Sequence, residues 1–272
     1  MKRDRNFHAV RVKSGFTLIE MIGVMAILTI MAAVLTPNVL HSIDRAAVVA
    51  EQQTLHNLGG QVKKYLNEYG APPTIVGWDA QIANYAELSQ LDIAVNKRQN
   101  GRVFLLDPDP LAFQQRAIIL SSMRQGMLLP TQANINTPAK FAALWGTLDG
   151  AVPSVASWGG WTAMAADYLV IERINFKSEY RSVQLQNNGN AHVVAPAIAP
   201  TVRYEIWAAK VTGGPIQFGT LAPGVGVSPP VVSGVRLLLY AGPSAAGGVD
   251  YNYLVSTTDR TLSFDGTHWS PQ

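Results

Sequence analysis

Residues 14–40 decide the architecture of this chain, and they read SGFTLIEMIGVMAILTIMAAVLTPNVL. No residue from Met21 to Leu40 carries a charge. A helix of that length rises about 30 Å, which is the thickness of the hydrocarbon core of a bilayer. The stretch therefore predicts a membrane-inserting helix. Basic residues precede it and a large polar region follows it, so the positive-inside rule places the N-terminus in the cytoplasm and the bulk of the chain across the membrane.

The positive charge of the chain is concentrated before this helix. Residues 1–15 carry a net charge of +4, whereas the whole chain carries +3, so residues 16–272 are nearly neutral at −1. Nucleic-acid binding depends on clustered Lys and Arg side chains. We therefore expect no nucleic-acid partner once residues 1–15 are removed.

Glu20 is the only acid within the apolar segment, where an unpaired carboxylate is strongly unfavourable. A basic leader, Gly15, Phe16, Thr17, two aliphatic residues and Glu20 precede the apolar run, and this combination resembles the cleavage and methylation site of the type IV pilin family. An ordinary signal peptide is the alternative, but the apolar run is longer than its usual hydrophobic region and no small-x-small cleavage site is evident.

The resemblance implies how the N-terminus is processed and used. It implies cleavage between Gly15 and Phe16 by an inner-membrane prepilin peptidase and N-methylation of Phe16. It also implies that Glu20 pairs with the N-terminal amine of a neighbouring subunit, which would compensate its charge in apolar surroundings. The expected function is a structural filament subunit and not an enzyme, with other pilins and a pilus assembly platform as partners. The precursor is expected in the bacterial inner membrane, and the product in an extracellular or periplasmic filament.

Several functions remain open at this stage. The lack of a Cys pair, the 15-residue leader and the large globular part fit a type IVb or minor pilin best. A type II secretion pseudopilin would share the same leader and Glu20. A membrane-anchored binding protein or enzyme would use residues 16–40 only as an anchor. Adhesion and DNA capture are rival roles for the filament itself.

The apolar helix is expected to continue as an amphipathic helix over residues 41–69. Apolar residues recur mostly every three or four positions, with most charged residues, Glu51 among them, placed on the other side. Pro37 removes a backbone hydrogen bond and predicts a kink, which together with Gly23 marks a stretch that loosens on filament packing; an ordinary helix end is the alternative. Gly59 and Gly60 weaken the helix, and Gly70 stops it.

Residues 70–272 are expected to form one globular α+β head, packed as an antiparallel sheet on the amphipathic half of the helix. Helical or mixed patterns cover residues 79–98, 112–124 and 138–148. Strand patterns cover residues 168–176, 202–211, 235–240, 251–257 and 261–264. Residues 213–234 and 242–248 are expected to be loops. Asp259-Arg260 suits a hairpin between the last two strands, and Asp265-Gly266 a further turn.

No residue pattern in the chain predicts a catalytic site or a cofactor. Cys is absent, which excludes disulfides, thiolate metal sites and a cysteine nucleophile, and the five His show no metal-site spacing. Asp107 and Asp109 could contribute to a Ca²⁺ site of the kind that some pseudopilins have, but the segment offers no third acid, so no metal is expected. The remaining aromatic residues suit either a stacking platform for a sugar or, more commonly, core packing: Trp158, Trp161, Tyr251, Tyr253, Phe264 and Trp269.

Overall fold

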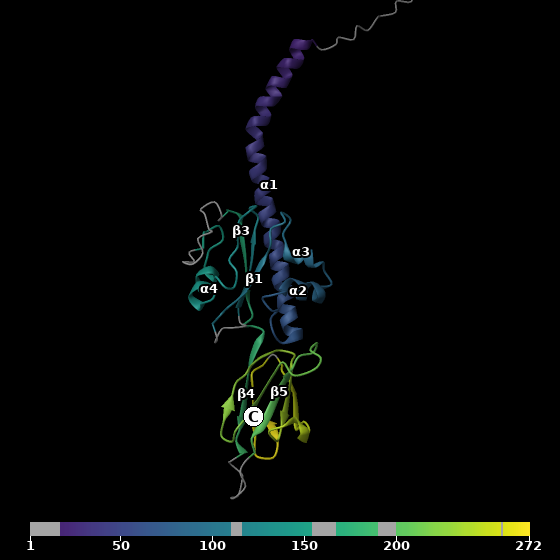
Figure 1. The fold of residues 1–272 in the computed structure, drawn as a ribbon, viewed down its shortest axis with the longest axis vertical. Helices are drawn as coiled ribbons and strands as arrows, with labels where there is room; N and C mark the ends of the chain where they lie inside the picture. Colours follow the sequence, from purple (N-terminus) through teal and green to yellow (C-terminus); the bar gives the residue numbers. More distant parts are fainter. Residues whose placement is uncertain (1–16, 110–115, 154–166, 190–199, 257) are drawn as a thin grey trace, which may run out of the picture. The chain divides into compact units, whose positions relative to one another are not determined.

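The computed structural model describes residues 17–109, 116–153, 167–189, 200–256 and 258–272. The chain forms two compact units, residues 1–47 and residues 48–272. One helix, α1 (Leu18–Tyr69), contributes to both. The sequence-based expectation of a long N-terminal helix followed by largely antiparallel sheets, an α+β fold, is confirmed (Figure 1).

Helix α1 ends where the sequence predicts. Gly70 adopts a φ of 73°, and its N–H donates to the carbonyl oxygen of Leu66 at 2.7 Å. This left-handed position favours glycine. A Cβ at Gly70 would also collide with Ile216 and crowd Ala208, so the residue stops the helix and lets the segment that carries both side chains, between two later strands, pack close to its end.

The first lobe of the larger unit, the helix–sheet lobe, comprises residues 48–176. Strands β1 (Val103–Leu106), β2 (Arg116–Ser122) and β3 (Leu169–Asn175) form an antiparallel sheet in the order β1-β2-β3. Helices α2 (Trp78–Ala86), α3 (Gln90–Ala94) and α4 (Pro138–Trp145) complete the lobe. Figure 1 shows the sheet between α4 and the C-terminal part of α1.

Both faces of this sheet are buried. Ala117 and Ile119 belong to the same apolar core as Leu55 and Leu58 of α1, whereas Ile118 packs in a second core together with Phe141 of α4. Gly59 lets β3 approach α1 closely, because a Cβ there would lie 3.0 Å from Oε1 of Glu172. Gly59 therefore serves packing, although it lowers helix propensity.

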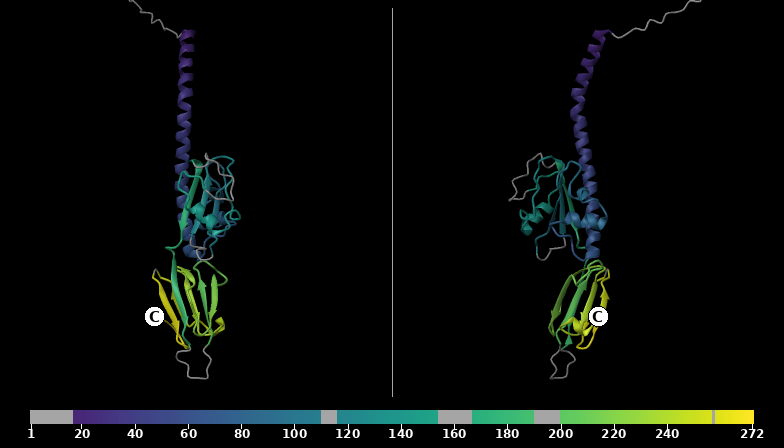
Figure 2. Two further views of the ribbon diagram at one scale, coloured as in Figure 1. Left: turned by 90° about the vertical axis from the view of Figure 1, so that its left-hand side faces the viewer. Right: turned by 45° about the vertical axis from the view of Figure 1, so that its right-hand side comes forward.

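The second lobe, the sandwich lobe, comprises residues 180–272 and lies at the C-terminal end of α1 (Figure 2). One sheet has the order β10-β9-β5-β6, and the other has the order β12-β11-β4-β7, with β8 also paired to β4. Inward-facing residues of both sheets, such as Leu185, Ile206 and Leu239, join one core cluster. The strands are β4 (Tyr180–Asn187), β5 (Val202–Trp207), β6 (Gln217–Leu221), β7 (Gly226–Val227), β8 (Pro230–Val232), β9 (Arg236–Tyr240), β10 (Tyr251–Leu254), β11 (Arg260–Phe264) and β12 (Trp269–Pro271).

Three sequence-based expectations for residues 70–272 were wrong. Residues 116–122 lie in a stretch expected to be helical or mixed, but they form β2, because a strand buried on both faces has the same unbroken apolar pattern as a buried helix. The expected loop at residues 213–234 contains β6, β7 and β8. Asp259-Arg260 does not join a hairpin, since β10 pairs with β9 whereas β11 pairs in parallel with β4. The turn expected at Asp265-Gly266 is confirmed between β11 and β12.

Candidate functional site

The N-terminal end of α1 is closed by a reciprocal pair of hydrogen bonds between Thr17 and Glu20. The backbone N–H and the hydroxyl of Thr17 both donate to Oε2 of Glu20 at 2.8 Å, and the N–H of Glu20 donates to Oγ1 of Thr17 at 3.3 Å. This is a capping box, which satisfies backbone donors that have no partner in the first helical turn. The negative carboxylate also lies at the positive end of the helix dipole.

The helix that follows this cap is apolar and uncovered. Every residue from Thr17 to Ile43 is exposed, including Leu28 at 54% and Ile30 at 65%. In α1 the segment is long and apolar enough to cross a membrane. An apolar surface of this extent does not face water in a stable protein, so lipid or other protein must cover it.

The other residues of the predicted assembly segment lie as follows. Gly23 and Pro37 are both inside α1, and the helix continues past Pro37 without a break. A Cβ at Gly23 would meet nothing within 4 Å. The kink at Pro37 stays a prediction, as does the loosening of the helix between Gly23 and Pro37 on filament packing. Gly15 and Phe16, the predicted cleavage junction, lie outside the described residues.

Residues 10–36 match the model of the prokaryotic N-terminal methylation motif. The chain carries a type IV prepilin-like signal. Its apolar helix fits a membrane-anchored precursor, and residues 10–36 have the features of a prepilin-like signal. No curated protein and no solved structure matches the chain significantly.

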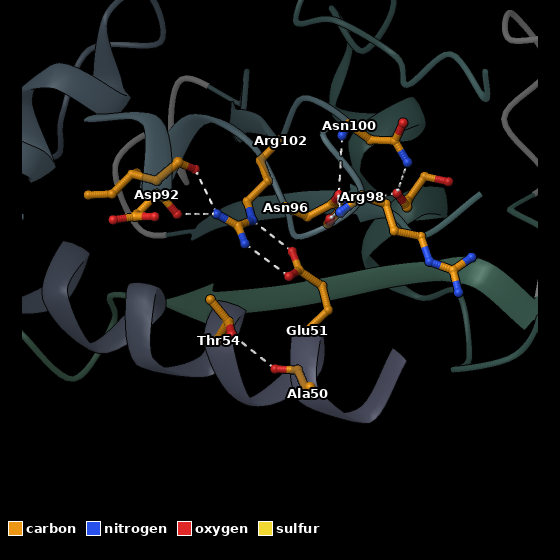
Figure 3. A network of polar contacts seen from close by, with 11 residues as sticks. Ala50, Glu51, Thr54, Asp92, Asn96, Arg98, Asn100 and Arg102 are labelled. Atoms are coloured by element: carbon orange, nitrogen blue, oxygen red, sulfur yellow. Dashed lines mark hydrogen bonds and ion pairs between the residues drawn. The ribbon is translucent and has the colours of Figure 1, made fainter. Parts of the chain in front are cut away.

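In this prepilin-like chain a buried ion pair fixes the second half of α1 to the helix–sheet lobe. Nε of Arg102 lies 2.7 Å from Oε1 of Glu51, and Nη2 of Arg102 donates to Oε2 at 2.9 Å. Both side chains are 2% exposed. Figure 3 shows the guanidinium between Glu51 and Asp92, and Nη1 donates to the carbonyl oxygens of Asp92 and Ile93 in α3.

Glu51 was expected on the polar face of the helix, and this expectation was wrong. The residue is 3% exposed because Arg102, 51 positions later, is folded over it. A bidentate pair with its remaining donors satisfied is the geometry in which a buried ion pair is tolerated. No local pattern around Glu51 reveals such a distant partner.

The loop that carries Arg102 is itself held by a buried amide. Nδ2 of Asn96, 2% exposed, donates to Oγ of Ser121 and to the carbonyl oxygen of Ser122 on β2. Its Oδ1 accepts from the N–H groups of Arg98 and Asn100 (Figure 3). These bonds fix the loop to the sheet. The loop in turn holds Arg102 beside α1.

A polar cluster joins the end of α1 to the sandwich lobe. Nζ of Lys210 lies 2.9 Å from Oε2 of Glu68, and the hydroxyl of Tyr85 donates to Oε1 of Glu68 at 2.8 Å. These hydrogen bonds lower the pKa of Glu68. Burial, followed by the neighbouring Glu68 carboxylate, raises the pKa of Tyr85 to about 12. The cluster is positioned to hold the two lobes together.

The residues considered for metal binding have structural partners. Asp107 is fully buried, its Oδ2 accepts from Nε of Arg116 at 2.6 Å, and its Oδ1 accepts from the N–H of Asp109. Among the histidines, Nδ1 of His56 lies 3.3 Å from Glu172, and Nδ1 of His268 lies 2.8 Å from Asp250. In the described part of the chain no three His, Asp or Glu residues gather as metal ligands.

The aromatic residues considered as a stacking platform divide between the core and its edge. Phe264 and Trp269 are buried, with ring centroids 5.6 Å apart, and Tyr251 and Tyr253 pack partly buried against the same core. Trp158 and Trp161 lie outside the described residues. Sequence analysis placed Thr17 in the pattern of the methylation site but missed its role as a helix cap, although the Thr-x-x-Glu spacing before an apolar run indicates a capping box.

Proposed function

We propose that this chain is the precursor of a structural subunit of a type IV pilus or related filament, and that it acts by assembly and not by catalysis. The observation that carries the proposal is an exposed apolar helix with one acid, Glu20, inside the matched methylation motif. Prepilin peptidase would cut after Gly15, and the methylated Phe16 would begin the mature chain. The helix over residues 16–40 would leave the inner membrane for the filament core.

The large globular unit favours a type IVb or minor pilin within this class, and a type II secretion pseudopilin is the runner-up. Both use the same N-terminal chemistry, and both place the precursor in the inner membrane. The partners would be other pilins, the peptidase and the assembly platform. A protein that is only anchored by residues 16–40 would need neither processing nor polymerisation.

The capping box defines how Glu20 would act in assembly. In the single chain its carboxylate binds the start of its own helix. During assembly the same carboxylate would pair with the N-terminal amine of a neighbouring Phe16, so the cap and the subunit contact share one group. An amine left unpaired in the apolar filament core would be strongly unfavourable.

Three variants separate the cap from the charge. Glu20→Gln keeps a side chain that can cap but removes the charge, Glu20→Ala removes both, and Thr17→Val removes the capping hydroxyl but keeps the carboxylate. We expect both Glu20 variants to be cleaved and membrane-inserted but incorporated into sheared filaments at least about ten-fold less, because one buried charge loses its partner. Thr17→Val should be incorporated at close to the wild-type level.

The measurements are immunoblotting of this subunit in sheared filaments and mass spectrometry of its N-terminus. Mass spectrometry should find methyl-Phe16 as the first residue. Wild-type incorporation of Glu20→Gln would refute the pairing mechanism, and an intact Met1 on membrane-extracted protein from the native host would refute the processing. If the wild-type protein keeps residues 1–15 and no variant changes its incorporation into filaments, the helix is only an anchor.

A further inference from the structure

The outer face of the sheet β10-β9-β5-β6 carries a polar and aromatic surface that the assembly proposal does not use. Along β5 the side chains alternate, so that Tyr204 and Ile206 enter the core whereas Arg203, Glu205 and Trp207 lie on the opposite face. The register places Trp207 opposite Arg236 of β9. The next strand places Asn252 opposite Leu238.

This face is hollowed into an open groove of about 820 Å³. Its floor includes Arg236 and Leu238 of β9 and Asn252 of β10, and Trp207 is also part of its lining. Val211 lies at the end near β5, and Val249 lies in the connection that precedes β10. The groove therefore extends over neighbouring strands and offers an indole and several hydrogen-bonding groups to an elongated ligand.

The indole of Trp207 is held in place by a buried carboxylate. Its Nε1 donates to Oε2 of Glu205 at 3.0 Å, and Glu205 is only 4% exposed. The hydroxyl of Tyr240 donates to the same oxygen at 2.9 Å, and Arg203 pairs with the other oxygen. Burial alone would raise the pKa of Glu205, but these hydrogen bonds outweigh it and lower the pKa. An aromatic ring fixed in this way loses little freedom when a ligand binds.

Arg236 brings a charge without a partner to the groove. Its guanidinium is exposed, and within the described part of the chain it forms no hydrogen bond or ion pair through its side chain. The acid in the lining, Asp250, is already engaged, since its Oδ1 lies 2.8 Å from Nδ1 of His268 and its Oδ2 accepts from the N–H of Trp269. Charge complementarity therefore favours a ligand with an anionic group over Arg236.

We propose that this groove binds an acidic oligosaccharide, with a sugar ring against Trp207 and a sugar carboxylate paired with Arg236. Aromatic rings bind the C–H faces of sugars, and Asn252 supplies both a donor and an acceptor for hydroxyl groups. The guanidinium fork matches a carboxylate in two parallel hydrogen bonds. The site would give the exposed lobe of a filament subunit a surface-binding activity that is independent of Glu20 and of cleavage.

Titration calorimetry with tetragalacturonate tests the proposal on the full chain in a polyoxyethylene detergent, since detergents with sugar headgroups would compete for the groove. The matched ligand is the fully methyl-esterified tetramer, which has the same rings without the charges. We expect saturable binding of the acid with a Kd below about 1 mM and at least about ten-fold weaker binding of the ester, because an ionic hydrogen bond is lost.

Arg236→Gln should weaken binding of the acid at least about ten-fold, and Arg236→Lys should be intermediate because it keeps the charge but not the fork. Arg260→Gln is the matched control, since Arg260 is an exposed Arg on the other sheet, and it should change the affinity less than about two-fold. All three substitutions are at exposed positions, and melting temperatures equal to that of the wild type will confirm that the variants fold.

Three results would overturn the proposal. The first is that tetragalacturonate shows no saturable binding up to about 10 mM. The second is that the acid and the ester bind with equal affinity. The third is that Arg236→Gln leaves the affinity for the acid unchanged. Loss of filament incorporation in Arg236→Gln without any glycan binding would instead assign this face to a subunit contact. None of these outcomes bears on the cleavage or pairing tests at Phe16 and Glu20.

Discussion

The two parts of α1 on either side of Val48 are both rich in apolar residues, but they differ in what covers them. Before Val48 the large apolar side chains are exposed, as Leu28 is at 54%. After it, Leu55, Val62 and Leu66 are fully buried by the chain's own sheets. The apolar residues of the second part fold the unit, whereas the described first part has an apolar surface that needs lipid or another protein as cover.

Two of the three glutamates of α1, Glu20 and Glu51, show the same division. Glu20 is exposed and binds its own helical turn, so its partner can be exchanged. Glu51 is buried and binds Arg102 through both oxygens, so its partner is fixed by the fold. The carboxylate of Glu20 is therefore free to take the partner that the assembly proposal gives it, whereas Glu51 is committed to the stability of the fold.

The largest expected effect comes from breaking the buried pair. Glu51→Ala leaves the guanidinium of Arg102 without a counter-charge in the core, and we expect it to lower the free energy of unfolding by about 3–5 kcal/mol. Glu20→Ala should lower it by no more than about 1 kcal/mol, the value of a helix cap. Urea unfolding of the detergent-solubilised chain, followed by near-ultraviolet circular dichroism, measures both.

The double variant Glu51→Leu with Arg102→Met is the control for the charge. Replacing both partners with apolar side chains leaves no unpaired group, so most of the lost stability should return. If Glu51→Ala and Glu20→Ala destabilise the chain equally, the proposed division between the two acids is wrong.

Paired leucine substitutions compare the apolar surfaces directly. Leu55→Ala should lower the free energy of unfolding by about 3 kcal/mol, because it removes buried contacts and leaves a cavity. Leu28→Ala, at an exposed position of the same helix, should change it by less than about 0.5 kcal/mol in detergent. Thermal melts of the two variants give the comparison, and a large loss from Leu28→Ala would show that the first part of α1 contributes to the folded unit.

The smallest expected effect is a pH dependence at the end of α1. The pKa of Glu68 is lowered in the folded chain by its hydrogen bonds to Lys210 and Tyr85. The stabilisation from these bonds is therefore complete above the unfolded pKa of about 4.3 and is lost as the pH falls through the lower folded value.

Glu68→Gln removes this titration. Because the side chain is 38% exposed, the variant's melting temperature should differ from that of the wild type by less than about 4 °C at pH 6. The difference should shrink between pH 5 and pH 3, as the wild type loses its ion pair. A difference that stays constant over this range would show that Glu68 does not titrate with folding.

Local patterns predicted α1 and five of the twelve described strands, because the causes of these elements are local. The apolar spacing and Gly70 lie within or beside α1, alternation in residues 202–207 marks β5, and the apolar run in residues 236–240 marks β9. The site residue Glu20 was recognisable because an acid among apolar residues is locally anomalous.

The features that the sequence did not predict depend on residues that are distant in sequence. The apolar run Ile118-Ile119-Leu120 suits a helix or a strand equally, and only α1 on one face and α4 on the other make it a central strand. The position of Glu51 depends on Arg102, and the division into two sheets depends on β11 pairing with β4, for example Arg260 with Val183. A single sequence contains no local indication of these pairings.

The chain passes from the helix–sheet lobe to the sandwich lobe once, through residues 176–179 between β3 and β4. A subunit whose sandwich lobe is attached to a surface would transmit tension through this single crossing into β3. There the load would run along the seven-residue register between β3 and β2, from Leu169 with Ser122 to Asn175 with Arg116. When paired strands are pulled along their length, their hydrogen bonds are loaded together and do not open one after another, so the register between β2 and β3 would carry the load as a whole.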